Sequence, residues 1–207
     1  MDIQEKKLAS RLLYLPLDVH EKVLLWLTHR GLKPVSEITV DRRNYSQLRK
    51  GIFKSSHDDK GPKIEKIRKW INDADLFYAV EDNYSTSWHV GKDKEKVILS
   101  SKIIRQFDYE NEYNSGILFG FPKSSATAYA KNRVKEDSVA IVWPGQMSSH
   151  PYLKSRYYLP YIFYAIRADR IKTDSVPAKL WADTIRKEIP RLASWHEKSF
   201  KTSLTTL

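Results

Sequence analysis

The chain contains no cysteine, only seven glycines and no long apolar segment. The absence of cysteine excludes disulfide bonds, thiolate metal sites and a thiol nucleophile. The glycine-rich loops that hold nucleotide phosphates are missing too, because neither Gly-x-Gly-x-x-Gly nor Gly-x-x-x-x-Gly-Lys-Ser occurs. No apolar run approaches the roughly 20 residues that span a bilayer, and residues 1–7 lack the apolar run of a secretory signal. We therefore expect a cytoplasmic protein without a membrane partner.

Acidic residues are fewer than basic ones. The chain has 25 aspartates and glutamates against 36 lysines and arginines, which gives a net charge of +11. The excess is concentrated between residues 42 and 69, where ten basic and three acidic side chains give +7. Such a concentration is typical of proteins that bind the phosphate backbone of nucleic acid. A merely solvated, soluble surface has the same composition. The residues that we predict to contact nucleic acid are Arg42, Arg43, Arg49, Lys50, Lys63, Lys66 and Lys69.

The N-terminal third of the chain has the periodicity of helices. Asp18 followed by Glu21 predicts a capping box at the start of a helix that Gly31 ends. Pro62 is expected to begin a second, amphipathic helix, with isoleucines on its inner face and lysines on its outer face. We therefore expect residues 1–75 to form a helical, basic subdomain.

The pattern changes after residue 75, where short apolar runs alternate with turns. We expect strands at 77–80, 87–90 and 138–143, and helices at 92–107 and 177–195, the last of them kinked at Pro190. The fold class predicted from this order is α+β. The helical part packs closely on a mixed α/β subdomain, residues 76–207, which contains a small sheet.

A Gly-Phe-Pro corner at Gly120–Pro122 opens another predicted helix, whose first turn carries Lys123, Ser124 and Ser125. Free N–H groups at a helix start, beside two hydroxyls and an ammonium, predict a small anion-binding site. Alternatively, the serines cap their own turn and the lysine lies in solvent. His89, at the end of a predicted strand, is a candidate proton donor for this site, or a packed histidine without a role in it.

Two segments, His89–Val97 and Gly116–Pro122, resemble a prokaryotic protein family that carries Gly-(Phe/Tyr)-Pro-x-Cys-Cys. The activity of that family is not established, so the resemblance implies a shape and not a reaction. Ser124 and Ser125 stand where the family has its two cysteines. The resemblance therefore implies that any thiol-dependent metal or redox site has been lost in this chain.

Three functions remain open from the sequence. The first is a module that binds RNA or DNA through its backbone, and the second is an enzyme or receptor for a small anionic ligand at Gly120–Ser125. The third is an interaction or scaffold protein that has lost a thiol-dependent site. The tyrosine-rich segment 152–164 is suited either to stacking on bases or to core packing. We expect no metal site and no cofactor, and the sequence does not indicate an oligomeric state.

Overall fold

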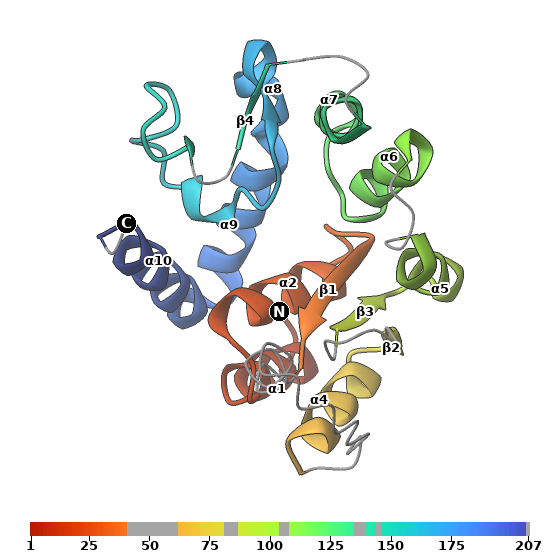
Figure 1. Cartoon of the computed structure of the whole chain (residues 1–207). Helices are drawn as coiled ribbons and strands as arrows, with labels where there is room; N and C mark the ends of the chain where they lie inside the picture. Colours follow the sequence, from red (N-terminus) through yellow and green to blue (C-terminus); the bar gives the residue numbers. More distant parts are fainter. Residues whose placement is uncertain (41–61, 81–86, 104–107, 135–139, 144–145, 206–207) are drawn as a thin grey trace, which may run out of the picture. The chain divides into compact units, whose positions relative to one another are not determined.

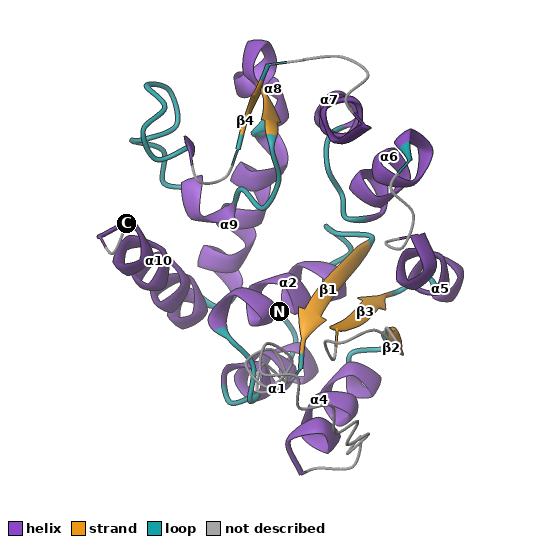
Figure 2. Cartoon of the chain, viewed as in Figure 1, coloured by secondary structure: helices purple, strands orange, loops and turns teal. Residues whose placement is uncertain are grey.

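The computed structural model describes residues 1–40, 62–80, 87–103, 108–134, 140–143 and 146–205 (Figure 1). The chain forms two compact units, Met1–Lys102 and Ile103–Leu207. Helices predominate in both, and each unit has one small antiparallel sheet (Figure 2). The predicted α+β class is confirmed at this level. No helix in the parts of the chain that the structure describes is long and apolar enough to cross a membrane.

The first unit places helices around a three-stranded sheet. Its elements are α1 (Ile3–Leu13), α2 (Val19–His29), β1 (Val35–Thr39), α4 (Pro62–Asp73), β2 (Phe77–Val80), β3 (Ser87–Gly91) and α5 (Lys94–Ile103). The strand order is β1-β3-β2 and both pairings are antiparallel, so β3 is the central strand. In this register Glu37 of β1 and Ala79 of β2 lie opposite His89 of β3.

The sheet lies nearer the N-terminus than we predicted, because β1 forms within the region expected to be helical. Pro34 precedes this strand, and Val35 and Ile38 are buried β-branched residues, which favour strands. Its hydrogen-bonding partner, β3, follows about fifty residues later, so the formation of β1 depends on a contact between distant parts of the chain. The boundary predicted at 75/76 falls where α4 gives way to β2, and β2 belongs to the first unit through its pairing with β3.

The helices predicted to begin at Asp18 and at Pro62 are present as α2 and α4, and the described part of the helix predicted at 92–107 is α5. The backbone N–H of Asp18 donates to the Glu21 carboxylate (2.9 Å), which completes the capping box of α2. Gly31, just beyond the end of α2, has a φ of 72°, a left-handed conformation that glycine adopts without strain. Helix α4 buries Ile67, Trp70 and Ile71 and exposes its lysines, as its periodicity predicts.

Lys33, between α2 and β1, is buried, and this burial lowers its pKa to about 7. Between pH 7 and its ordinary value of 10.5 the unfolded chain therefore binds more protons than the folded one, so stability rises with pH in this window. We expect the free energy of unfolding in urea to increase by about 1–3 kcal/mol from pH 7 to pH 9. The Lys33→Met variant should lose this increase. An unchanged increase in that variant would assign it to other groups.

The second unit is built mainly from pairs of helices. Its elements are α6 (Tyr109–Leu118), α7 (Lys123–Val134), β4 (Ile141–Val142), η2 (Leu159–Tyr161), β5 (Ile166–Arg167), η3 (Ala168–Arg170), α8 (Ile171–Asp174), α9 (Val176–Glu188) and α10 (Pro190–Thr205). Strands β4 and β5 form an antiparallel pair. The described part of the strand predicted at 138–143 is thus only two residues long. The helix predicted at 177–195 is two helices, because the chain breaks at Ile189 and Pro190 opens α10.

Helices α6 and α7 pack against each other across the Gly-Phe-Pro corner (Figure 1). A Cβ on Gly116 would lie 2.8 Å from the Cβ of Ala126, so only glycine permits this close approach of the two helices. Gly120 has a φ of 80° and ends α6. Helix α7 then begins at Lys123, directly after Pro122, as the sequence predicts.

Candidate functional site

One flank of α4 carries lysines without acidic partners. Lys63, Lys66 and Lys69 are all exposed, and no described residue forms an ion pair with any of them. At 100° per residue they spread over roughly 120° of the helix circumference. On the opposite side of α4, Arg68 donates to Glu65 (3.0 Å) and its guanidinium lies over the Trp88 ring (5.6 Å). That side is therefore occupied by internal contacts, whereas the lysine flank is open.

Helix α1 extends this flank. The indole Nε1 of Trp70 in α4 donates to the carbonyl of Leu8 in α1 (3.0 Å), and Arg11 pairs with Asp73 (2.6 Å). These contacts hold α1 against α4. Lys7, one turn before Arg11 in α1, is exposed as well.

We call these five cations the α1–α4 basic surface. It consists of Lys7, Arg11, Lys63, Lys66 and Lys69. The acid beside it, Asp73, is neutralised by Arg11. Tyr14, at the end of α1, is 71% exposed and offers an aromatic ring beyond the Arg11 end of the surface. An open group of cations with an exposed ring nearby is the composition that single-stranded nucleic acid binds.

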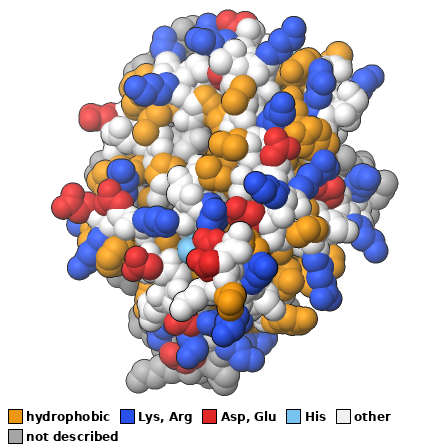
Figure 3. All heavy atoms as spheres, turned by 180° about the vertical axis from the view of Figure 1, so that it is seen from behind, with side chains coloured by type: hydrophobic (Ala, Val, Ile, Leu, Met, Phe, Trp, Pro, Cys, Tyr) orange, Lys and Arg blue, Asp and Glu red, His pale blue; other side chains and the backbone are white. Residues whose placement is uncertain are grey.

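The face drawn in Figure 3 carries mixed charge. On the face drawn in Figure 3, Lys and Arg side chains stand in several groups, with acidic and apolar side chains between them. Of the residues predicted to bind nucleic acid, Lys63, Lys66 and Lys69 lie together on α4. Arg42, Arg43, Arg49 and Lys50 lie outside the described residues. Any binding of nucleic acid by described residues would therefore depend on the α1–α4 basic surface and not on net charge.

The predicted anion site at the start of α7 holds an anion that belongs to the chain. Ser124 Oγ donates to the Asp174 carboxylate (2.7 and 2.8 Å to its two oxygens), and Ser125 Oγ donates to the same group (2.7 Å). Asp174 and Ser125 are buried, and the Tyr164 hydroxyl donates to the carbonyl of Asp174. Lys123 is exposed. An external anion would have to displace Asp174 from both hydroxyls, so the site as built links α7 to α8.

His89, the other residue predicted for the anion site, is completely buried in the central strand of the first unit. It belongs to a different unit from Ser124 and Ser125. Its backbone pairs with β1 and β2 and its imidazole is buried, which is typical of a structural histidine. Among the described residues no group of three His, Asp or Glu side chains is placed to hold a metal ion.

Sequence reasoning missed several of the residues that shape these sites. Asp174 is the last residue of the short helix α8, and nothing near it in the sequence indicates a contact with serines fifty residues earlier. Lys7 and Arg11 lie outside the basic stretch at 42–69, although their spacing of four residues on a predicted helix was a usable signal. Comparison of the chain with protein-family models, with curated proteins and with solved structures found no match. The family resemblance of the Gly-Phe-Pro corner therefore stays a prediction.

Proposed function

We propose that this protein binds nucleic acid, RNA or DNA, by contacting the phosphate backbone with the α1–α4 basic surface. The observation that carries this proposal is the open lysine flank of α4. Lys63, Lys66 and Lys69 are exposed and without ion pairs to described residues, and Lys7 is exposed on α1, which contacts α4. A cation that is already neutralised by a neighbouring carboxylate gains little from a phosphate, whereas these ammonium groups keep their full charge for it.

The geometry suits one strand of a backbone. Lys63 and Lys69 are six residues apart, which corresponds to about 9 Å along the helix axis. Together with Lys7 they offer several neighbouring positive charges to a run of phosphates. The exposed ring of Tyr14 adds a stacking surface for an unpaired base, which is worth about 1–3 kcal/mol per base in proteins that bind single strands. We therefore expect single strands to bind more tightly than duplexes of equal length.

The salt dependence of binding tests this proposal. Each phosphate that is neutralised on a single strand contributes about −0.7 to the slope of log K against log salt. The triple variant Lys63→Gln, Lys66→Gln, Lys69→Gln should therefore reduce the slope by about two units. We suggest fluorescence anisotropy with a labelled 20-nucleotide single strand over a series of salt concentrations.

A matched control removes the same charge elsewhere. Lys94, Lys102 and Lys179 are also exposed, and the triple glutamine variant at these positions should keep the slope of the unmodified protein. Equal losses in the two variants would show that only net charge matters. No salt-dependent binding by the unmodified protein would end the proposal.

A further inference from the structure

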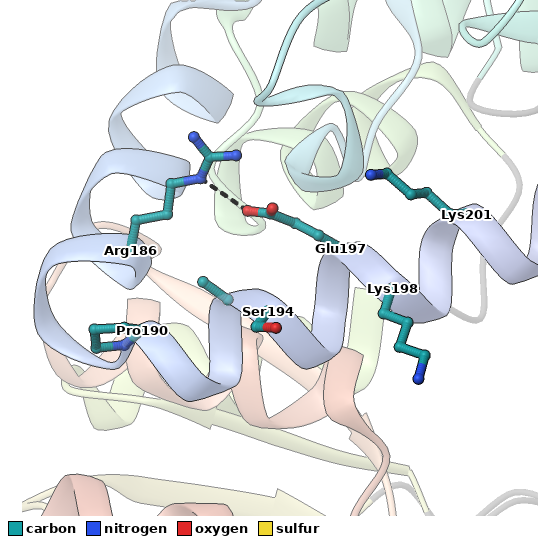
Figure 4. Close-up of a pocket in the computed structure, with 7 residues that line it drawn as sticks. Arg186, Pro190, Ser194, Glu197, Lys198 and Lys201 are labelled. Atoms are coloured by element: carbon teal, nitrogen blue, oxygen red, sulfur yellow. Dashed lines mark hydrogen bonds and ion pairs between the residues drawn. The ribbon is translucent and has the colours of Figure 1, made fainter.

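A surface groove of about 530 Å³ lies in the second unit, where the C-terminal turn of α9 meets α10 (Figure 4). Its lining residues are Arg186, Pro190, Ala193, Ser194, Glu197, Lys198 and Lys201. Three of these side chains are cationic and one is acidic. The groove is unrelated to the predicted anion site at the start of α7, which is filled by Asp174.

Arg186 is held in place by groups that leave part of its guanidinium available. Its Nε donates to the Glu197 carboxylate (2.8 Å), and its guanidinium carbon lies 4.5 Å from the centroid of the Tyr157 ring. Tyr157 is fixed in turn by a hydrogen bond from its hydroxyl to Asp183 (2.6 Å). The two terminal nitrogens of Arg186 form no hydrogen bond with a described residue, and Figure 4 shows one of them pointing away from Glu197. The side chain is 40% exposed, so a ligand can reach these nitrogens.

Glu197 holds Arg186 in position and is not the group that binds a ligand in the groove. The same carboxylate oxygen accepts from Arg186 and from the hydroxyl of Tyr161 (3.2 Å). Because this oxygen already accepts two hydrogen bonds, one of them from a guanidinium, the negative charge of the Glu197 carboxylate is largely compensated. The hydrogen bond with Glu197 also raises the pKa of Arg186, so the guanidinium stays charged.

A second cation faces the same space. In Figure 4 the ammonium of Lys201 points toward the side of Glu197 and Arg186, whereas Lys198 points away from it. No described residue forms an ion pair with Lys201. Arg186, Lys201 and Glu197 together give the groove a net positive charge. The groove presents the planar guanidinium of Arg186 and the ammonium of Lys201.

We propose that the α9–α10 groove is a binding site for a phosphate group. Arg186 supplies two parallel N–H donors and Lys201 supplies the second positive charge. A guanidinium that is stacked on a ring and tethered through Nε loses little freedom on binding, and its outer edge matches two oxygens of a phosphate. The phosphate belongs either to a small phosphorylated molecule or to a nucleic-acid backbone, and both offer the same chemistry to the groove.

The test is a calorimetric titration of the full chain with inorganic pyrophosphate, with sodium chloride at equal ionic strength as the reference. Arg186→Lys keeps the charge but loses the fork, and we expect it to weaken binding about ten-fold or more. Lys201→Gln should weaken binding about three- to five-fold. Lys179→Gln is the matched control and should stay within about two-fold of the unmodified protein, because Lys179 is exposed on α9 but does not line the groove.

Two results of these titrations would contradict the proposal. Binding of pyrophosphate no tighter than that of chloride, or equal losses in Lys201→Gln and Lys179→Gln, would overturn the site. Lys201 is exposed near the end of α10, so its variant tests the proposal even if Arg186→Lys affects folding. Titration of Arg186→Lys with a 12-nucleotide single strand then identifies the source. Weaker binding assigns the phosphate to nucleic acid, and unchanged binding assigns it to a small molecule. Failure of nucleic-acid binding at the α1–α4 basic surface would not affect the pyrophosphate result.

Discussion

Replacing both Ser124 and Ser125 with alanine is expected to lower the free energy of unfolding by about 3–5 kcal/mol. The two hydroxyls are the donors that the structure gives to the Asp174 carboxylate, and this carboxylate is buried. Removing both leaves a buried charge without compensation, which costs far more than the loss of an ordinary hydrogen bond. Urea denaturation followed by circular dichroism measures the effect.

Two further variants show whether the buried charge is the cause. Ser101 and Ser149 each donate only to a backbone carbonyl three residues earlier, so the double alanine variant at these positions should cost less than about 1 kcal/mol. Adding Asp174→Asn to the Ser124 and Ser125 double variant removes the charge and should restore at least about 1 kcal/mol. A loss below 1 kcal/mol in the Ser124 and Ser125 variant would mean that Asp174 finds other compensation, and our account of this corner would be wrong.

Trp70→Ala should destabilise the protein by about 3–5 kcal/mol, because it empties a completely buried site. Trp70→Phe keeps most of the packing but removes the indole N–H that binds the carbonyl of Leu8, and it should cost about 1–3 kcal/mol. Differential scanning calorimetry checks both values. Trp143, which is 40% exposed, provides the comparison, and Trp143→Ala should cost clearly less. Equal effects at the two tryptophans would contradict the role that we give Trp70 in joining α1 to α4.

Local sequence signals predicted the elements whose ends and faces are determined within a few residues. The capping box of Asp18 and Glu21, the stop at Gly31 and the isoleucine spacing of α4 all act through near neighbours in the chain. The strand β1 was missed because its partner β3 lies far away in the sequence. Helix α6, whose first turn is acidic, was missed as well. Asp108 in fact caps the helix by accepting from the backbone N–H of Asn111 (2.8 Å).

The candidate sites divide in the same way. The helical period of 3.6 residues places Lys63, Lys66 and Lys69 on one flank of α4, so this flank could be predicted from the sequence. The addition of Lys7 could not be predicted, because it depends on the hydrogen bond between Trp70 and Leu8, which are 62 positions apart in the sequence. The serines at the start of α7 were predicted to bind an external anion, and in the structure they donate to a carboxylate. That the anion is Asp174, from the chain itself, depends on how α7 and α8 pack, and no pattern near Ser124 reveals it.

Lysine footprinting tests the central claim most directly. The full chain is acetylated briefly with and without a 20-nucleotide single strand, and mass spectrometry measures the modification of each lysine. Binding through the α1–α4 basic surface predicts that Lys7, Lys63, Lys66 and Lys69 are protected together, whereas Lys94 and Lys179 react as before. Uniform protection of all lysines, or protection that spares the α4 flank, would contradict the claim.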